Sequence, residues 1–489
     1  MTTALSPDLE KKLVPASSRP RRNTEAGLLA FAGLLGIAAY AEVCLAGWGA
    51  LPNSFFLVSV IGVVLLGALH VLVRIFAPYA DPILLPCAAL LTMLGLVMIY
   101  RLDLGKFEKV KDPAKYVWVS TRQLEYFILA LISFGVVLVL FAIVLSMLQK
   151  GNKFILFGKK VFTTRIWNVP FWIILAGLVG VILICSPRIP GFSIVEANGA
   201  RIAVGKGPIR IQPAEFAKIA LTIFFAGILV YVRRSVKLDT FKIRGFSFPA
   251  KREIIIVGIV WFGILTMLAW DKDFGTVLMF FGLFIFMLYI ATGRAVWLII
   301  GGVLLSVGAV LGYFMFSIIQ QRFDNLFDPW ATAELPGGGH QMITSLYGLA
   351  DGGLFGKGLG RGLPDTVVIA ESDYITSSFG EELGMAGLLA ILVIYVILIE
   401  RTLRTAIICQ DRFQKLVTSG FATILALQVF AVVGGVVRIL PLTGLVTPFL
   451  AAGGSALVAN WIMLAMVFRV SDSSRRPLPL FAKVVEEGL

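Results

Sequence analysis

Residues 275–316 read GTVLMFFGLFIFMLYIATGRAVWLIIGGVLLSVGAVLGYFMF, and Arg294 is the single charged residue among them. The stretch divides into two apolar runs, 275–291 and 294–316. Each run has the length that an α-helix needs to cross the hydrocarbon core of a bilayer. The sequence therefore predicts two membrane-spanning helices here, joined by a tight turn.

The same pattern recurs along the whole chain. Hydrophobic residues make up 58% of the 489 residues and charged residues 15%, with a mean hydropathy of +0.90. A soluble globular protein carries about 25% charged residues. Ten further apolar runs bring the prediction to an all-α polytopic membrane protein with about twelve transmembrane helices: 26–48, 54–76, 82–100, 125–148, 169–186, 214–231, 253–270, 383–400, 416–437 and 446–468.

The distribution of basic residues predicts the orientation. An even number of spans places both termini on one side, and that side then holds 27 Lys and Arg residues against 15 on the other, with Lys218 inside a span. Basic residues concentrate on the cytoplasmic side of membrane proteins. We therefore expect cytoplasmic tails at 1–25 and 471–489, and we attribute the net charge of +14 to orientation rather than to nucleic acid.

A long loop, 317–382, follows the predicted spans 275–291 and 294–316 and is expected to face outward. It holds nine Asp and Glu residues against Arg322, Lys357 and Arg361, and it keeps enough apolar side chains to fold. Long ordered loops of this kind are usually functional. An outward position excludes cytosolic nucleotides as substrates, and its GGLFGKGLG lacks the GxxxxGK[ST] order of a phosphate-binding loop. Its glycines favour tight turns and close backbone approach, which would leave amides free to face an anion.

Several polar residues lie at or inside the predicted spans. Gln212, Glu215 and Lys218 begin the span 214–231, and Glu215 and Lys218 share a helix face at a spacing of three residues. Ionisable groups in a membrane usually face a bundle interior or a polar cavity. Two readings remain open for them: an internal ion pair that holds the bundle together, or a cationic wall for a phosphate-bearing ligand.

Three further carboxylate or basic sites also have alternative roles. Asp273 either caps the helix that follows or acts in a site, and Glu381 and Glu382 either stabilise a helix N-terminus or act in a site. Arg438 ends a span beside Pro441 and Pro448, so it either reaches the membrane interface or contacts a phosphate.

Six segments in order resemble the SEDS family (shape, elongation, division and sporulation), which includes RodA and FtsW. GARIAV (199–204) resembles the family's GARRW, QPAEFAK (212–218) its QPSExxK, and KDFGT (272–276) its DLGT. The segments 345–360, 363–384 and 440–455 resemble the family's GKGLG, LPE-TDF-EELG and LP-TG-PF-SYGGS patterns. Departures such as Ala214, for the motif serine, remove no charged residue. The resemblance implies a ten-helix core at 81–470, including the extracellular loop 317–382 between spans 9 and 10. Residues 26–80 are then two additional N-terminal transmembrane helices.

The resemblance also implies a function. SEDS proteins are peptidoglycan glycosyltransferases that polymerise lipid II on the outer face of the bacterial cytoplasmic membrane, and their essential carboxylate maps onto Asp373. A carboxylate there would act as the general base for an inverting transfer; a divalent cation such as Mg²⁺ or Mn²⁺, held by Asp373, is the alternative. Candidate substrate-binding residues are Lys357, Lys218, Arg201, Glu215, Gln212, Asp273, Gln341, Arg361 and Arg438.

Partners and alternatives complete the expectations. The family implies lipid II, undecaprenyl-pyrophosphate-linked glycan and a class B penicillin-binding protein as partners. The short tails favour a RodA-like role in elongation over an FtsW-like role in division. A flippase or transporter for lipid-linked precursors is the alternative function, and a catalytically silent scaffold is a third.

Overall fold

The computed structural model describes residues 20–110, 116–149, 171–188, 194–197, 200–206, 209–236, 240–243, 246–249, 252–335 and 338–476. The predicted tails therefore lie outside the described residues over 1–19 and 477–489. Residues 150–168, in the basic segment between the predicted spans 125–148 and 169–186, also lie outside them.

Each of the twelve predicted spans contains a helix. In chain order they are α2 (Arg22–Trp48), α3 (Asn53–Phe76), α4 (Leu84–Glu108), α5 (Val119–Gln149), α6 (Phe171–Cys185), α7 (Pro213–Val236), α8 (Arg252–Trp270), α9 (Phe274–Thr292), α10 (Val296–Met315), α13 (Ile375–Ile408), α14 (Arg412–Val436) and α15 (Gly454–Arg475). Within the described residues, ten of them are long and apolar enough to span a membrane, and α6 and α8 contribute shorter apolar helices. The prediction of an all-α polytopic membrane protein is confirmed.

Short elements decorate the ends of this bundle. Three antiparallel strands, β1 (Ile194–Ala197), β2 (Ala200–Lys206) and β3 (Ile209–Ile211), precede α7, and a hairpin of β4 (Thr240–Ile243) and β5 (Phe246–Pro249) precedes α8. The 3₁₀ turn η2 (Ser186–Arg188) follows α6. The long loop contains α11 (Ser317–Phe327), α12 (His340–Gly352) and the 3₁₀ turn η3 (Pro364–Thr366).

The last predicted span, 446–468, was placed too early. Helix α15 begins only at Gly454, and residues 446–453 form an irregular apolar segment. The Tyr395 hydroxyl donates to the Pro448 carbonyl at 2.5 Å, and a Cβ on Gly95 would lie 2.1 Å from the Leu450 carbonyl oxygen. Irregular backbone at membrane depth is tolerated where protein buries it.

Helix α13 also differs from its predicted bounds, because it begins at Ile375 rather than at 383. It carries a break at Gly384, whose φ of 71° and ψ of −176° are not helical. A Cβ there would lie 2.3 Å from the Gly356 amide nitrogen, so the loop docks on the break. Glu381 and Glu382 consequently lie before this break and not in a first helical turn.

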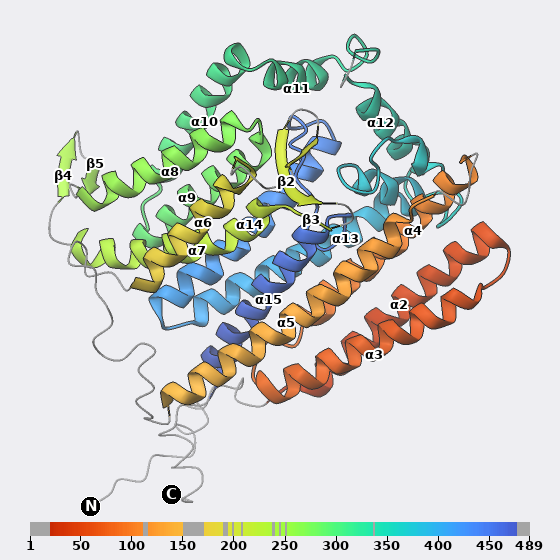
Figure 1. Ribbon diagram of the computed structural model, residues 1–489, viewed down its shortest axis with the longest axis horizontal. Coiled ribbons are helices and arrows are strands. Elements are labelled where there is room, and N and C mark those ends of the chain that lie inside the picture. The colour runs from red at the N-terminus through yellow and green to blue at the C-terminus, as the bar shows by residue number, and fades with distance from the viewer. Residues whose placement is uncertain are drawn as a thin grey trace, which may run out of the picture.

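The two ends of the bundle are distinct (Figure 1). We call the end that carries α11, α12 and η3 the outer end. Its loop is tied to α4 by an ion pair between Arg101 and Glu382 at 2.9 Å and another between Lys106 and Glu371 at 2.6 Å. The start of α2 and the end of α15 meet at the opposite end, which we call the inner end.

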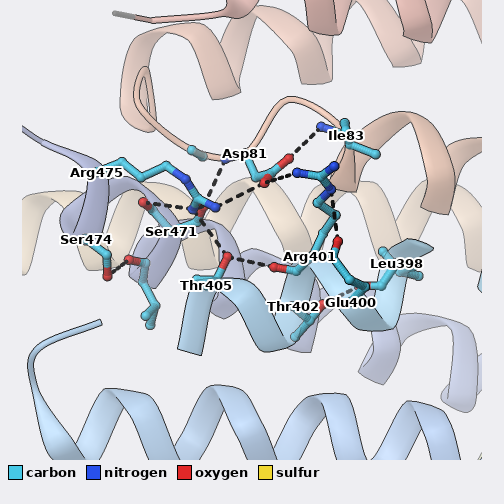
Figure 2. A network of polar contacts seen from close by, with 12 residues as sticks. Asp81, Ile83, Leu398, Glu400, Arg401, Thr402, Thr405, Ser471, Ser474 and Arg475 are labelled. Carbon is cyan, nitrogen blue, oxygen red and sulfur yellow. Dashed lines mark hydrogen bonds and ion pairs between the residues drawn. The ribbon is translucent and has the colours of Figure 1, made fainter. Parts of the chain in front are cut away.

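A network of buried charges holds the inner end together (Figure 2). The Asp81 carboxylate accepts from Arg475 at 3.0 Å and from the Ile83 amide at 3.0 Å, and Arg401 lies 3.9 Å away. The Ser471 hydroxyl accepts a hydrogen bond from the Asp81 amide at 2.9 Å. We call these residues (Asp81, Arg401, Ser471, Asp472 and Arg475) the inner network. It joins the turn between α3 and α4 to α13 and α15.

Helices α2 and α3 form a pair beside α4 and α5 (Figure 1). At the inner end, Arg22 pairs with Glu25 and donates to the Ala80 carbonyl, and the Glu25 carboxylate lies 2.9 Å from the His70 ring. The pair is therefore fixed to the core by polar contacts as well as by apolar packing.

Candidate active site

Asp373 lies at the outer end, immediately before the N-cap of α13. The preceding stretch buries one face through Val367, Ala370 and Tyr374, a spacing of three and four residues. The Glu371 carbonyl accepts from the Ala452 amide at 2.8 Å, which fixes the stretch against the irregular segment 446–453. The Asp373 carboxylate is left partly exposed, and Ser372 donates to it at 3.0 Å.

Arg322 of α11 is the basic residue that faces this carboxylate. It donates to the Thr443 carbonyl at 3.2 Å, and its charge acts on both Asp273 and Asp373. Burial raises the pKa of the Asp373 carboxyl, and the carboxylate of Glu371 raises it further, whereas the Arg322 guanidinium lowers it in part. The result is a carboxylate that is poised to take up a proton more readily than an ordinary aspartate.

Asp273 has the capping role, one of the two that the sequence left open. It caps α9 by accepting from the Thr276 amide at 3.1 Å. Burial raises the pKa of its carboxyl, the Arg322 charge lowers it and the Glu215 charge raises it. A Cβ on Gly275 would lie 2.3 Å from the Thr443 carbonyl oxygen, so α9 approaches the segment that Arg322 binds.

These contacts bring together residues that are distant in the sequence. We call Glu215, Asp273, Arg322, Glu371 and Asp373 the outer cluster. It combines four carboxylates with one guanidinium, and it is contributed by α7, the α8–α9 turn, α11 and the loop before α13. The structure thus assembles three of the predicted residues, Glu215, Asp273 and Asp373, in one place.

Lys218 lies behind the outer cluster and is fully buried. Its ammonium is 2.5 Å from the Glu215 carboxylate, 3.0 Å from the Asn460 amide oxygen and 3.5 Å from that of Gln428. The internal ion pair is therefore the arrangement present, and it fixes Glu215. The backbone amide of Gln212 donates to the Ser455 hydroxyl at 3.0 Å, and the Gln212 side chain is partly exposed.

The loop residues Lys357 and Arg361 lie on the surface. The Lys357 ammonium is 2.7 Å from the exposed Asp351 carboxylate, which raises the pKa of Lys357. Arg361 is exposed, and its guanidinium has no carboxylate within ion-pair distance among the described residues. Neither side chain contacts the outer cluster in the part of the chain that the structure describes.

The expectation that the glycine-rich segment leaves its amides free was wrong. The amides of Lys357 and Gly358 donate to the carbonyls of Glu381 and Glu382 at 3.1 and 2.9 Å. The Gly360 amide donates to the Glu382 carboxylate at 2.9 Å. Two of these amides thus bind backbone carbonyls, and the anion that the Gly360 amide faces is the buried Glu382 carboxylate of the protein itself.

Arg438 caps the end of α11. It donates to the carbonyls of Leu326 and Phe327 at 2.6 Å each, and its guanidinium stacks on the Trp330 ring at 5.4 Å. Basic side chains near a helix C-terminus stabilise its last carbonyls. The contact fixes the helix that carries Arg322.

The two remaining predicted site residues are Arg201 and Gln341. Arg201 lies in β2, where its backbone pairs with Glu196 of β1, and its side chain is outside the description. Gln341 is the second residue of α12 and partly exposed. Neither is brought to the outer cluster by a contact among the described residues.

The donor set does not match a divalent-cation site. Within the described ranges, no three Asp, Glu, His or Cys side chains are grouped as metal ligands. The charges of Asp273 and Asp373 both act on the Arg322 guanidinium, and Glu371 binds Lys106. Protein cations, Arg322 and Lys106, therefore already act on these carboxylates.

Arg322, Glu371 and Lys106 were not predicted as site residues. A signal existed for Arg322, since it is the one basic residue in 317–356, directly after an apolar span. Glu371 and Lys106 pair with each other, and no local sequence pattern links the long loop to α4.

Comparisons with known proteins identify the family. The chain is 38% identical over 489 residues to the peptidoglycan glycosyltransferase RodA of Mycobacterium leprae, covering 98% of this chain and 96% of that protein. It is 37% identical over 460 residues to the RodA of Mycobacterium tuberculosis, covering 94% and 92%. A solved structure described as "Structural coordination of polymerization and crosslinking by a peptidoglycan synthase complex" shares the fold, with a TM-score of 0.57, 20% identity, and coverage of 81% of this chain and 98% of that one. The model of the FtsW, RodA and SpoVE family, described as "Cell cycle protein", matches residues 82–476, and the chain therefore belongs to this family.

Proposed function

We propose that this protein is a peptidoglycan glycosyltransferase that polymerises lipid II, with Asp373 as the general base. The observation that carries the proposal is the outer cluster, in which a partly exposed carboxylate of raised pKa faces a guanidinium beside a long docked loop. The mycobacterial relatives that align with nearly the whole chain are named peptidoglycan glycosyltransferase RodA.

The proposed step is a single displacement. The 4-hydroxyl of the acceptor GlcNAc attacks C1 of the donor MurNAc, and its proton passes to the Asp373 carboxylate. The bond from C1 to the pyrophosphate oxygen breaks, and undecaprenyl pyrophosphate leaves with the electron pair, so that the configuration inverts. A base whose pKa is raised toward the working pH holds that proton better than an ordinary aspartate.

The cations of the site would act on the pyrophosphate. Arg322 lies beside Asp373 and can stabilise negative charge that develops on the leaving group. Lys357 and Arg361 are exposed on the docked loop and are proposed to meet the substrate phosphates or sugars. Arg201, Gln212 and Gln341 stay candidate binding residues.

The remaining predicted residues position the site in this proposal. Lys218 and Glu215 form one buried pair, Asp273 caps α9, and Arg438 caps α11. Each fixes an element that contributes to the outer cluster. Their removal would displace the reacting groups, even where no substrate atom is touched.

The setting is proposed from the family and the charge pattern. The protein would lie in the bacterial cytoplasmic membrane, with both termini cytoplasmic and the outer cluster on the outer face. A class B penicillin-binding protein is the proposed partner, in line with the solved relative described as a peptidoglycan synthase complex. The transporter alternative gains no support, because the outer cluster lies at one end of the bundle, on the turns and the loop before α13.

The test is polymerisation of purified lipid II, with and without the cognate transpeptidase, by wild-type protein, Asp373→Asn and Glu334→Gln. Glu334 is an exposed carboxylate in the same loop and serves as the matched control. The proposal expects glycan strands from wild type and Glu334→Gln and none from Asp373→Asn that is folded. Strands from all three variants would remove Asp373 from the role of base. No strands from wild type with its partner present would contradict the function.

A further inference from the structure

A cavity of about 400 Å³ lies between the α2–α3 pair and the core helices α4 and α5. Its walls are mainly apolar and include Ile37, Tyr40, Val58, Leu66, Met93 and Leu96. A volume of this size is typical of small-ligand sites. The cavity is bounded by all four helices, so the α2–α3 pair is needed to form it.

One end of the cavity is lined by aromatic and hydroxyl side chains. Trp48, Tyr100 and Trp118 lie there, and the Trp48 indole donates to the Tyr100 hydroxyl at 3.0 Å. Phe107 packs on both tryptophans, with ring centroids 6.4 and 5.2 Å apart. Tryptophan and tyrosine prefer the headgroup level of a bilayer. This end is therefore the mouth, at the depth where a lipid's polar group lies.

Two lysines near this end of the cavity bind residues of the long loop. Lys106, next to Phe107, forms its ion pair with Glu371 of the outer cluster, and Lys109 pairs with Asp365 of the loop. Both ammonium groups keep solvent exposure, with 30% and 60% of each side chain accessible. An anionic headgroup that emerges from the cavity would meet these two cations beside Asp373.

We propose that this cavity binds the polyprenyl chain of the lipid-linked substrate, with the pyrophosphate emerging at Lys106 and Lys109. The proposal rests on the proposed function. A polyprenyl carrier has one hydrocarbon chain to place in one narrow cavity, whereas a phospholipid has two acyl chains. The fixed cations at the mouth and the continuity with the outer cluster favour a substrate whose headgroup must reach Asp373.

Glycines on one helix provide a matched test. Gly62 of α3 lines the cavity, and a Cβ there would meet nothing within 4 Å, so the backbone at this position accepts a side chain and Gly62→Phe adds a ring at the cavity wall. Gly67 lies on the same helix, is equally unobstructed and is exposed outside the cavity. Gly67→Phe therefore makes the same change on α3 without occupying the cavity.

The measurement is the KM for lipid II with a full-length prenyl chain and for an analogue with a short chain. Gly62→Phe is expected to raise the long-chain KM about tenfold, because the chain would lose the burial of roughly two methylene groups. The short-chain KM should stay close to that of wild type. Gly67→Phe is expected to leave both unchanged. Equal long-chain KM values for Gly62→Phe and Gly67→Phe would overturn the proposal.

A binding readout separates this proposal from the proposed function. A polyprenyl phosphate with a photoreactive group on its chain is expected to label cavity residues of wild type and Gly67→Phe, and not of Gly62→Phe. Unlabelled lipid II should compete, and phosphatidylglycerol should not. Labelling outside the cavity, or equal competition by phosphatidylglycerol, would overturn it. Cavity labelling in a protein that makes no glycan strands would support the site and contradict the function.

Discussion

The two ends of the bundle both gather charged residues, but they use them differently. In the inner network, Asp81 is 3% exposed and binds Arg475, the Ile83 amide and, more distantly, Arg401 (Figure 2). In the outer cluster, Asp373 accepts one bond, from Ser372, and has no ion pair within 4 Å among the described residues.

The difference indicates which charges hold the fold and which are available for chemistry. A buried charge is tolerated when its partners satisfy it, and removing one partner leaves the others uncompensated. Asp472 follows this rule, because it accepts from the Tyr79 amide at 2.9 Å and from Arg476 at 2.8 Å. In the outer cluster Glu215 and Glu371 have their own ammonium partners, Lys218 and Lys106, whereas Asp373 has no ion pair within 4 Å among the described residues and a raised pKa.

The largest effect is expected at Asp373. The substitution Asp373→Asn keeps the size of the side chain and removes the base, which should lower the polymerisation rate by about 10²- to 10⁴-fold. Thermal unfolding should be unchanged or shifted upward, because a carboxyl of raised pKa is costly to bury in its charged form. A rate within twofold of Glu334→Gln would break the proposed distinction between the two ends.

The inner network should show the reverse behaviour. Asp81→Asn leaves the largely buried Arg475 without its carboxylate, so we expect a loss of about 3–5 kcal/mol in the free energy of unfolding. Glu400→Gln is the control, because Glu400 is an exposed partner of Arg401 and should change stability by less than about 1 kcal/mol. Denaturant unfolding in micelles measures both. Equal stabilities would show that the inner network does not hold the fold.

A smaller effect is expected where the loop docks at the outer end. Gly384→Ala would place a Cβ 2.3 Å from the Gly356 amide nitrogen in a backbone conformation with φ of 71°. The strain of such a residue is about 1–3 kcal/mol. We expect faster proteolysis within 353–363 and slower polymerisation, with Gly67→Ala as the unobstructed control. Unchanged proteolysis would mean that the break does not hold the loop.

The smallest effect is a shift in pH dependence. Asp373 acts as a base only when ionised, so kcat/KM should rise with pH through its pKa, which lies above the ordinary range of an aspartate. Arg322→Gln removes the cation that lowers this pKa, and the acid limb should move to higher pH. Arg322→Lys should move it less, and Asp81→Asn should leave it in place. If the acid limb of Arg322→Gln does not move, or moves to lower pH, then Arg322 does not lower the pKa of the catalytic base.

The sequence predicted the helices because their signal is local. Length and hydropathy place all twelve, and the spacing of Glu215 and Lys218 correctly suggested a pair on one face. The same signal misplaced the start of α15, since residues 446–453 are apolar without being helical. Burial of irregular backbone depends on Gly95 and Tyr395, which lie on other helices.

The candidate site was only partly predictable, because its contacts join distant segments. Asp373 was found through motif resemblance and Asp273 also as a possible helix cap, but the guanidinium whose charge acts on both comes from α11, and no spacing rule connects the three. For Glu382 the sequence offered a helix terminus or a role in a site, and it did not predict the partner, Arg101, 281 residues earlier. Arg438 carried two hypotheses, and its contacts with Leu326 and Phe327 correspond to neither.

The most direct test measures activity and stability together on Asp373→Asn and Asp81→Asn from matched preparations. Each sample is scored for lipid II polymerised per folded molecule and for its unfolding midpoint. The account predicts a crossed result: Asp373→Asn stays as stable as wild type and makes no strands, while Asp81→Asn is destabilised and keeps its rate per folded molecule. A stable Asp81→Asn variant that is as inactive as Asp373→Asn, or an active Asp373→Asn variant, would contradict it.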